Sequence, residues 1–200
     1  MKRLYIIFIF LFSVATSAEI IKFDLGTISG LYDTDKKCSL LVECAVSEND
    51  ILSNYGRRSF YRTDTRTASP YLFIFSGYIR GHLISSETKG DKTFNMFNIA
   101  PQDAKLNCGL YKEIEMFERK EILKGSVVRI KCGAIFLKNS PERWIKGSIQ
   151  IPDAFFKVLY DRNNKATHAW YLENKPITKA NPDNYTISIE RLKELTGMNL

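Results

Sequence analysis

The chain contains only two histidines, and one of them, His82, lies in the stretch GYIRGHLISS at residues 77–86. It follows an Arg-Gly pair and separates a segment with strand character from a polar segment with loop character. Imidazole titrates near pH ~6.5, so it can take a proton from water close to neutral pH, which lysine and arginine cannot do. A lone histidine at a strand end is more often structural, so His82 needs support from other residues before it counts as a general base. The second histidine, His168, has no chemically suggestive neighbours and is expected to be structural.

Further polar residues with chemical potential lie on a predicted helix that follows the His82 segment. Residues 103–124 carry apolar side chains at approximately helical spacing, and a glycine directly afterwards can end the helix. On this helix Asn107, Glu115 and Arg119 spread over roughly 120° of one side. Taken alone, Glu115 and Arg119 are an i, i+4 pair typical of a solvated surface salt bridge. The order strand, Arg-Gly-His, loop, helix nevertheless brings His82 within reach of this polar side.

The remaining pattern predicts an α+β domain with a mainly antiparallel central sheet. Strands are predicted at residues 39–47, 71–80, 126–137, 148–161 and 167–174. Residues 85–92 indicate a loop, and residues 188–197 a short helix with Ser188 as its N-cap. The aromatic run YLFIF at 71–75 could stack on nucleic-acid bases, but the packing of a buried strand is the favoured interpretation.

The N-terminal residues have the layout of a secretory signal peptide. Residues 1–18 carry two basic side chains, then an apolar run, then small residues that suit a cleavage site. The alternative, an uncleaved anchor, is less favoured because the apolar run is short for a membrane span. We therefore expect one exported domain over residues 19–200, either periplasmic or secreted.

The composition of the exported part points towards a polyanionic partner without establishing one. Without the first 18 residues the chain has 27 basic and 22 acidic side chains, a net charge of +5. An even number of cysteines in an exported chain predicts up to two disulfides, with all three pairings left open. The four residues are Cys38, Cys44, Cys108 and Cys132. None forms a CxxC pair, which argues against a structural zinc site.

Two stretches together carry a specific family resemblance. RGHL at 80–83 and TFNMFNIAPQDAKLNCGLYKEIEMFERK at 93–120 closely resemble the DNA/RNA non-specific endonucleases of the ββα-metal superfamily. The resemblance covers the chain from about residue 40 to the C-terminus, and its central block fits the family in order and spacing. The matching positions are Arg80, Gly81, His82, Asn98, Ile99, Ala100, Pro101, Gln102, Asn107 and Glu115.

The resemblance implies a ββα-metal (His-Me finger) fold, with one long active-site helix, and a metal-dependent hydrolysis of phosphodiesters in DNA and in RNA. It implies His82 as the general base and Asn107 as the protein ligand of one Mg²⁺, for which Mn²⁺ can substitute. Glu115 would hold the water ligands of the metal and orient the site, and Asn98 would fix the metal-site loop or touch the substrate. The DNA and RNA substrates would be read through their phosphates, with little sequence selectivity.

Arginines complete the set of site residues that the resemblance implies, because a guanidinium group binds phosphate oxygens bidentately. Arg80 would do so beside the catalytic base. Arg119 matches an arginine that some members place near the phosphate, and either Arg57 or Arg58 matches an arginine that precedes the first motif.

One position departs from the pattern, and it motivates a second hypothesis. The family commonly has Asp before Arg-Gly-His, whereas this chain has Ile79. The alternative is therefore a catalytically weakened nucleic-acid-binding protein on the same scaffold. A third hypothesis, a phosphodiesterase for small esters, fits the arginines and the net charge less well.

Overall fold

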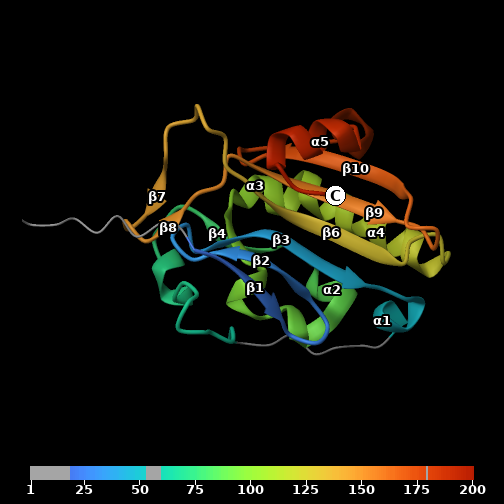
Figure 1. Cartoon of the computed structure of the whole chain (residues 1–200), viewed down its shortest axis with the longest axis horizontal. Coiled ribbons are helices and arrows are strands. Elements are labelled where there is room, and N and C mark those ends of the chain that lie inside the picture. Colours follow the sequence, from blue (N-terminus) through green and yellow to red (C-terminus); the bar gives the residue numbers. More distant parts are fainter. Residues whose placement is uncertain (1–18, 53–59, 179) are drawn as a thin grey trace, which may run out of the picture.

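A six-stranded antiparallel sheet forms the centre of the molecule, in the order β1-β2-β3-β6-β9-β10 (Figure 1). The computed structural model describes residues 19–52, 60–178 and 180–200. Every residue of β9 is buried, because this strand lies inside the sheet and both of its faces are covered. The strands are β1 (Ile20–Asp24), β2 (Ser29–Asp33), β3 (Cys38–Ala45), β6 (Arg129–Ile135), β9 (Ala154–Tyr160) and β10 (Ala166–Glu173).

Helices cover the two faces of this sheet. Helix α4 (Lys112–Leu123) turns Ile114 and Ile122 into the larger core, where they pack with residues of β3, β6 and β9. Helix α5 (Ile189–Thr196) places Leu192 on the opposite face, against β9 and β10. Ser188 caps α5 by accepting a hydrogen bond from the Arg191 amide, so the predicted C-terminal helix is confirmed.

A two-stranded hairpin precedes the long helix and gives the ββα order. Strand β4 (Ile79–His82) pairs antiparallel with β5 (Ile99–Gln102), and the chain then enters α3 (Ala104–Leu106), the π-helical turn η4 (Asn107–Tyr111) and α4. A smaller core packs against the hairpin through Ile99 of β5. Its members include Phe73, Met96, Ile99, Ile145 and Ile149.

Short elements connect these parts. The small hairpin of β7 (Trp144–Ile145) and β8 (Ile149–Gln150) belongs to the smaller core. The helical turns are α1 (Glu48–Leu52), η1 (Pro70–Phe73), α2 (Ser86–Lys89), η2 (Gly90–Thr93), η3 (Met96–Asn98) and η5 (Pro182–Tyr185). None of the helices in the described ranges is long and apolar enough to cross a membrane.

The α+β class and the mainly antiparallel sheet are confirmed, but several local predictions are wrong. The segment 71–80 is not one buried strand, because residues 70–73 form η1 and only residues 79–80 of the segment belong to β4. The predicted loop 85–92 contains the helical turn α2. Strands β1 and β2 extend the sheet where no strand was predicted. The expected disulfides are absent, since all four cysteines are free thiols, three of them buried.

Candidate active site

His82 ends strand β4 and is held between aromatic rings. Its ring centroid lies 4.7 Å from that of Phe94, edge to face, and 5.8 Å from that of Tyr61. Two residues earlier, Arg80 is exposed, and its guanidinium carbon lies 4.8 Å from the centroid of the Tyr61 ring. Tyr61 therefore contacts both the predicted base and the predicted phosphate-binding arginine, and it fixes their common environment. Tyr61 was not among the site residues predicted from the sequence.

A contact across the hairpin connects Gly81, the residue before His82, to the predicted metal ligand. The side chain of Gln102 lies over Gly81, where an added Cβ would come within 2.6 Å of the Gln102 Cβ. Only glycine leaves room there, so Gln102 can extend its amide towards the helix. The Asn107 Nδ2 atom donates a hydrogen bond of 2.6 Å to Gln102 Oε1. This bond fixes the orientation of the Asn107 amide and leaves its Oδ1 as the atom that can accept a cation.

The helix that carries Asn107 has a kink two residues later, at Gly109. Asp103 caps its start by accepting hydrogen bonds from the amides of residues 105 and 106. The backbone of Gly109 then departs from helical geometry, and an added Cβ there would meet the Ile177 carbonyl oxygen at 2.6 Å. Single π-helical turns are frequent at functional sites because they re-aim a side chain within a helix. The expected single helix over 103–124 is therefore real but kinked at Gly109, two residues after the predicted metal ligand.

Glu115 lies two turns beyond Asn107 on the same helix and is half-buried. Burial is the main cause that raises the pKa of Glu115 to about 7, and the carboxylates of Glu118 and Glu87 act in the same direction. The cations of Lys157 and Arg119 oppose this shift. A carboxyl group with such a pKa is poorly compensated by its protein neighbours, so it suits a position beside a bound cation.

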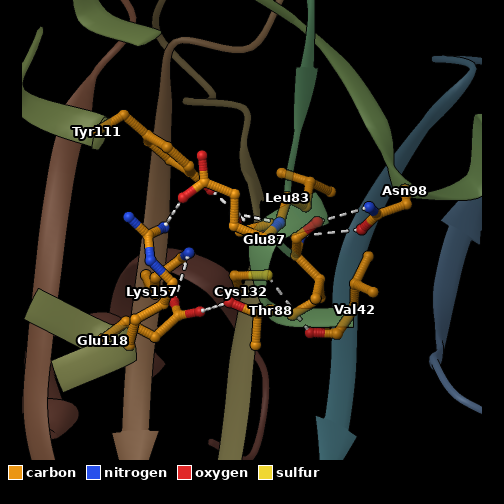
Figure 2. Close-up of polar contacts among 12 residues, drawn as sticks. Val42, Leu83, Glu87, Thr88, Asn98, Tyr111, Glu118, Cys132 and Lys157 are labelled. Carbon is orange, nitrogen blue, oxygen red and sulfur yellow. Dashed lines mark hydrogen bonds and ion pairs between the residues drawn. The ribbon is translucent and has the colours of Figure 1, made fainter. Parts of the chain in front are cut away.

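A buried ion pair connects helix α4 to strand β9 of the sheet (Figure 2). The Lys157 Nζ atom of β9 lies 2.8 Å from Glu118 Oε2, and both side chains are completely buried. Thr88 of α2 donates a hydrogen bond of 2.7 Å to the other carboxylate oxygen of Glu118. Burial alone would lower the pKa of Lys157, but the Glu118 carboxylate and nearby anionic groups raise it well above its ordinary value. The network joins α4, β9 and α2 into one unit.

The backbone just after His82 is tied to both the helix and the hairpin. The Tyr111 hydroxyl of η4 donates a hydrogen bond of 3.0 Å to the Leu83 carbonyl oxygen. Asn98 is fully buried, and its Oδ1 accepts from the Ile84 amide while its Nδ2 donates to the carbonyls of Ile84 and Thr93 (Figure 2). Of the two roles predicted for Asn98, these bonds favour fixing the loop.

The predicted arginines are placed in different ways. Arg80 lies on the exposed side of the hairpin, as described above. Arg119 forms its ion pair with Glu87 of α2, at 2.5 Å between Nη1 and Oε2, rather than with Glu115. Arg57 and Arg58 lie outside the described residues. The predicted structural residue His168 stacks on Trp170 of β10, with a centroid distance of 5.6 Å.

The sequence profile of the family described as DNA/RNA non-specific endonuclease matches residues 15–200 of this chain. The chain belongs to this family. It is 25% identical to human mitochondrial endonuclease G over 175 residues, which cover 78% of this chain and 56% of that protein. It is 24% identical to the mitochondrial nuclease EXOG of Mus musculus over 196 residues, which cover 84% of this chain and 53% of that protein. The chain thus spans about half the length of these relatives.

The fold of the DNA/RNA non-specific endonuclease family is confirmed by a solved structure. The crystal structure of EndoG in its complex with EndoGI matches with a TM-score of 0.75 and 16% identity, over 90% of this chain and 84% of that chain. At this level of identity the match establishes the ββα-metal fold alone.

The residues of this family member fit a metal held mainly by water. Among the described residues, no group of three or more His, Cys, Asp or Glu side chains could hold a metal ion. A cage of carboxylates or imidazoles in the described part is therefore excluded. Asn107, with its amide nitrogen bonded to Gln102, offers one oriented oxygen, and Mg²⁺ can accept a single amide oxygen because it retains several waters. Gln102 itself belongs to the matched motif, but its role could not be read from the sequence.

Proposed function

We propose that this protein is an endonuclease that hydrolyses phosphodiester bonds of DNA and RNA with little sequence selectivity. The observation that carries the proposal is the connection across the β4–β5 hairpin. His82 and Arg80 flank Gly81, whose missing side chain admits Gln102, and Gln102 orients Asn107. A base, a phosphate-binding cation and a metal-binding oxygen are thus presented by one rigid unit.

The roles of the side chains follow from their chemistry. His82 takes a proton from the attacking water. The rings of Tyr61 and Phe94, which contact His82, hold its imidazole in place. Arg80 binds a phosphate oxygen and stabilises the charge that develops there. Arg119 now binds the largely exposed Glu87, so a substrate phosphate can compete for the same guanidinium.

Asn107 would hold Mg²⁺ or Mn²⁺, and we assign to Glu115, on the following helical segment, the orientation of its water ligands. When bound, the ion supplies positive charge that stabilises the leaving oxygen and the phosphate. Contacts to the substrate run through phosphate, so we expect cleavage to be salt-sensitive and weakly selective between sequences.

We further propose that the protein is exported after removal of residues 1–18. The proposal rests on the signal-peptide pattern of these residues, which lie outside the described part of the chain. N-terminal sequencing of the protein recovered outside the cytoplasm should begin at Glu19. Recovery of the full-length chain from the membrane fraction would contradict it.

The test of the nuclease activity compares the wild-type protein with His82→Ala. The substrates are supercoiled plasmid and a structured RNA, each with Mg²⁺ and with a chelator. We expect cleavage of both by the wild-type protein only with the metal, and a loss of at least about 100-fold in His82→Ala. His168→Ala is the matched control, since the same residue type is removed away from the hairpin. Undiminished cleavage by His82→Ala would reject the assigned base.

The position of Ile79 supports keeping a weakened nucleic-acid-binding protein as a second candidate. Ile79 is the register partner of Gln102, so the departure from the family pattern lies beside the residue that orients Asn107. If the natural site is impaired, Ile79→Asp should raise turnover of plasmid strongly while DNA binding changes little. Unchanged turnover would show that the natural site is already competent. A chromogenic small phosphodiester, assayed beside the plasmid, separates the third candidate, a small-ester phosphodiesterase.

A further inference from the structure

An open hollow with aromatic walls lies beside the catalytic hairpin. Its volume is about 480 Å³, and its lining includes Phe60, Tyr61, Pro70, Tyr71 and Arg80. Tyr61 and Arg80 are the residues that also define the surroundings of His82. The hollow therefore shares a wall with the candidate active site and is continuous with the place where a substrate phosphate would lie.

The aromatic residues of this hollow are presented to solvent. The side chain of Tyr71 is 76% exposed and that of Phe60 61% exposed, although large aromatic side chains are usually well covered. Tyr71 lies on η1, whose other apolar residues Leu72 and Phe73 turn into the smaller core. The exposure of Tyr71 is thus produced by a well-anchored turn rather than by a loose end.

The local sequence builds this turn firmly. Ser69 caps η1, because its hydroxyl accepts a hydrogen bond from the Tyr71 amide, and Pro70 occupies the first turn. Across the hollow, the Thr67 hydroxyl accepts from the Asp64 amide and donates to the Asp64 carbonyl. Asp64 also binds the Arg66 guanidinium. The walls are therefore formed before any ligand arrives, which reduces the entropy cost of binding.

The chemistry of the lining selects the occupant. Aromatic faces, a proline ring and a guanidinium suit a flat, polarisable ring, and the hydroxyls of Thr63 and Ser69 offer hydrogen bonds to its edge. Arg80 beside this lining suits an attached phosphate. We propose that the hollow binds one unstacked nucleobase of the substrate, next to the phosphate that is cleaved. The proposal rests on the proposed nuclease function and deepens it, since it makes unpaired or easily unstacked nucleic acid the preferred substrate class.

The experiment measures whether removing a base from the substrate and removing the Tyr71 ring from the protein lower kcat/KM to the same extent. Single-stranded oligonucleotides carry one abasic nucleotide immediately 5′ or 3′ of a monitored linkage, and cleavage at that linkage gives kcat/KM. For the wild-type protein we expect one of the two abasic positions to lower kcat/KM by about 5- to 100-fold, the range of one stacking contact. Tyr71→Ala should lower cleavage of the intact oligonucleotide by a similar factor and should then be insensitive to the abasic nucleotide.

Two further variants make the comparison specific. Tyr71→Phe keeps the ring and should retain most of the activity. Phe75→Ala is the matched control, because Phe75 is a fully exposed aromatic residue close in sequence that does not line the hollow. Its kcat/KM and its abasic sensitivity should equal those of the wild-type protein.

The other outcomes overturn the inference in distinguishable ways. If the wild-type protein cleaves neither the oligonucleotides nor the plasmid and the structured RNA, the proposed function itself fails. If it cleaves plasmid and structured RNA but none of the oligonucleotides, only the base-binding hollow is rejected. If it cleaves the oligonucleotides but neither abasic position matters, or Tyr71→Ala keeps the full abasic effect, again only the base-binding hollow is rejected. A change of oligomeric state in Tyr71→Ala, measured by size-exclusion chromatography with light scattering, would instead identify the hollow as an interface between copies of the chain.

Discussion

The two sides of the candidate active-site hairpin and helix use residue types in opposite ways. Behind helix α4, Glu118 and Lys157 are completely buried, a rare position for charged side chains (Figure 2). On the open side, Phe60 and Tyr71 are largely exposed, although large aromatic side chains are usually well covered. The contrast separates two tasks, because the buried charges position the helix and the exposed rings are available to a ligand.

The buried Glu118–Lys157 pair is not mainly a source of stability. Removing two charges from water costs several kcal/mol for each ion, and their attraction only about offsets this. What the pair supplies is geometry. Glu118 has one oxygen for Lys157 of β9 and one for Thr88 of α2, so α4 is fixed in rotation and in height against two other elements. Because Glu115 lies three residues earlier on α4, the network also fixes the part of the helix that carries it.

The largest predicted effect breaks this buried network. In Lys157→Met the Glu118 carboxylate loses its cation inside the core, so the free energy of unfolding should fall by about 3–5 kcal/mol. Urea denaturation followed by circular dichroism measures the change. The double variant Lys157→Met with Glu118→Leu removes both charges and should recover most of the loss. A double variant as unstable as the single one would contradict the assignment of the loss to an uncompensated charge.

Gln102 orients the Asn107 amide, so its substitution should lower the affinity for the metal rather than the stability of the fold. Gln102→Leu withdraws the acceptor that orients Asn107, and such supporting contacts are worth about 10- to 100-fold in metal affinity. Titration of Mn²⁺ by electron paramagnetic resonance gives the affinity without reference to activity.

Gln102→Glu is the control for this effect, because its carboxylate still accepts the Asn107 hydrogen bond. It should retain metal binding. Equal Mn²⁺ affinity in Gln102→Leu and in the wild-type protein would show that Asn107 needs no such orientation or is not the ligand.

These regions also show which parts of the fold and of the candidate site could be predicted from the sequence. The active-site helix was predictable from the apolar spacing of residues 103–124, and the ββα order was implied by the family resemblance of the Arg-Gly-His and Asn-Ile-Ala-Pro-Gln motifs. Strand β5, the second strand of the hairpin, was not predicted from the local pattern. The Glu118–Lys157 pair was not predictable, since 39 residues separate its members and only the sheet brings them together. The same holds for the π-helical turn, which depends on the close approach of Ile177 to Gly109.

The error at residues 71–80 has a different physical origin. A short apolar run does not reveal by itself whether it forms a strand or a helical turn. Here Ser69 and Pro70 start a 3-10 turn, and Phe75 adopts a positive φ of 57° that breaks any extended run. Leu72, Phe73 and Tyr78 then pack in the smaller core, while Tyr71, Ile74 and Phe75 are exposed. The base-stacking interpretation, disfavoured for a buried strand, thereby regains its structural basis.

A smaller effect concerns the pH dependence of stability in the metal-free protein. The Glu115 carboxyl has a pKa of about 7 in the folded chain and an ordinary value of 4.5. Between these values the folded state binds more protons than the unfolded state, so stability falls as the pH rises through this window. Because the side chain is half-buried, we reduce the full linkage value and expect a loss of about 1–2 kcal/mol between pH 5 and pH 8.

Urea denaturation in the presence of a chelator, at pH 5 and at pH 8, measures this loss. Glu115→Gln cannot ionise, so its stability should change less between the two pH values than that of the wild-type protein. An unchanged pH dependence in this variant would assign the titration to another group.

The smallest expected effect is on stability at the open side. Tyr71→Ala removes a largely exposed ring, and substitutions at such positions usually change the free energy of unfolding by less than about 0.5 kcal/mol. Leu72 and Phe73, which anchor the same turn in the smaller core, remain. Urea denaturation of Tyr71→Ala should therefore match that of Phe75→Ala and of the wild-type protein, while only Tyr71→Ala changes cleavage of oligonucleotides. A stability loss above 1 kcal/mol in Tyr71→Ala alone would mean that its ring helps to hold the turn, and the contrast between a positioning side and a ligand-binding side would not hold.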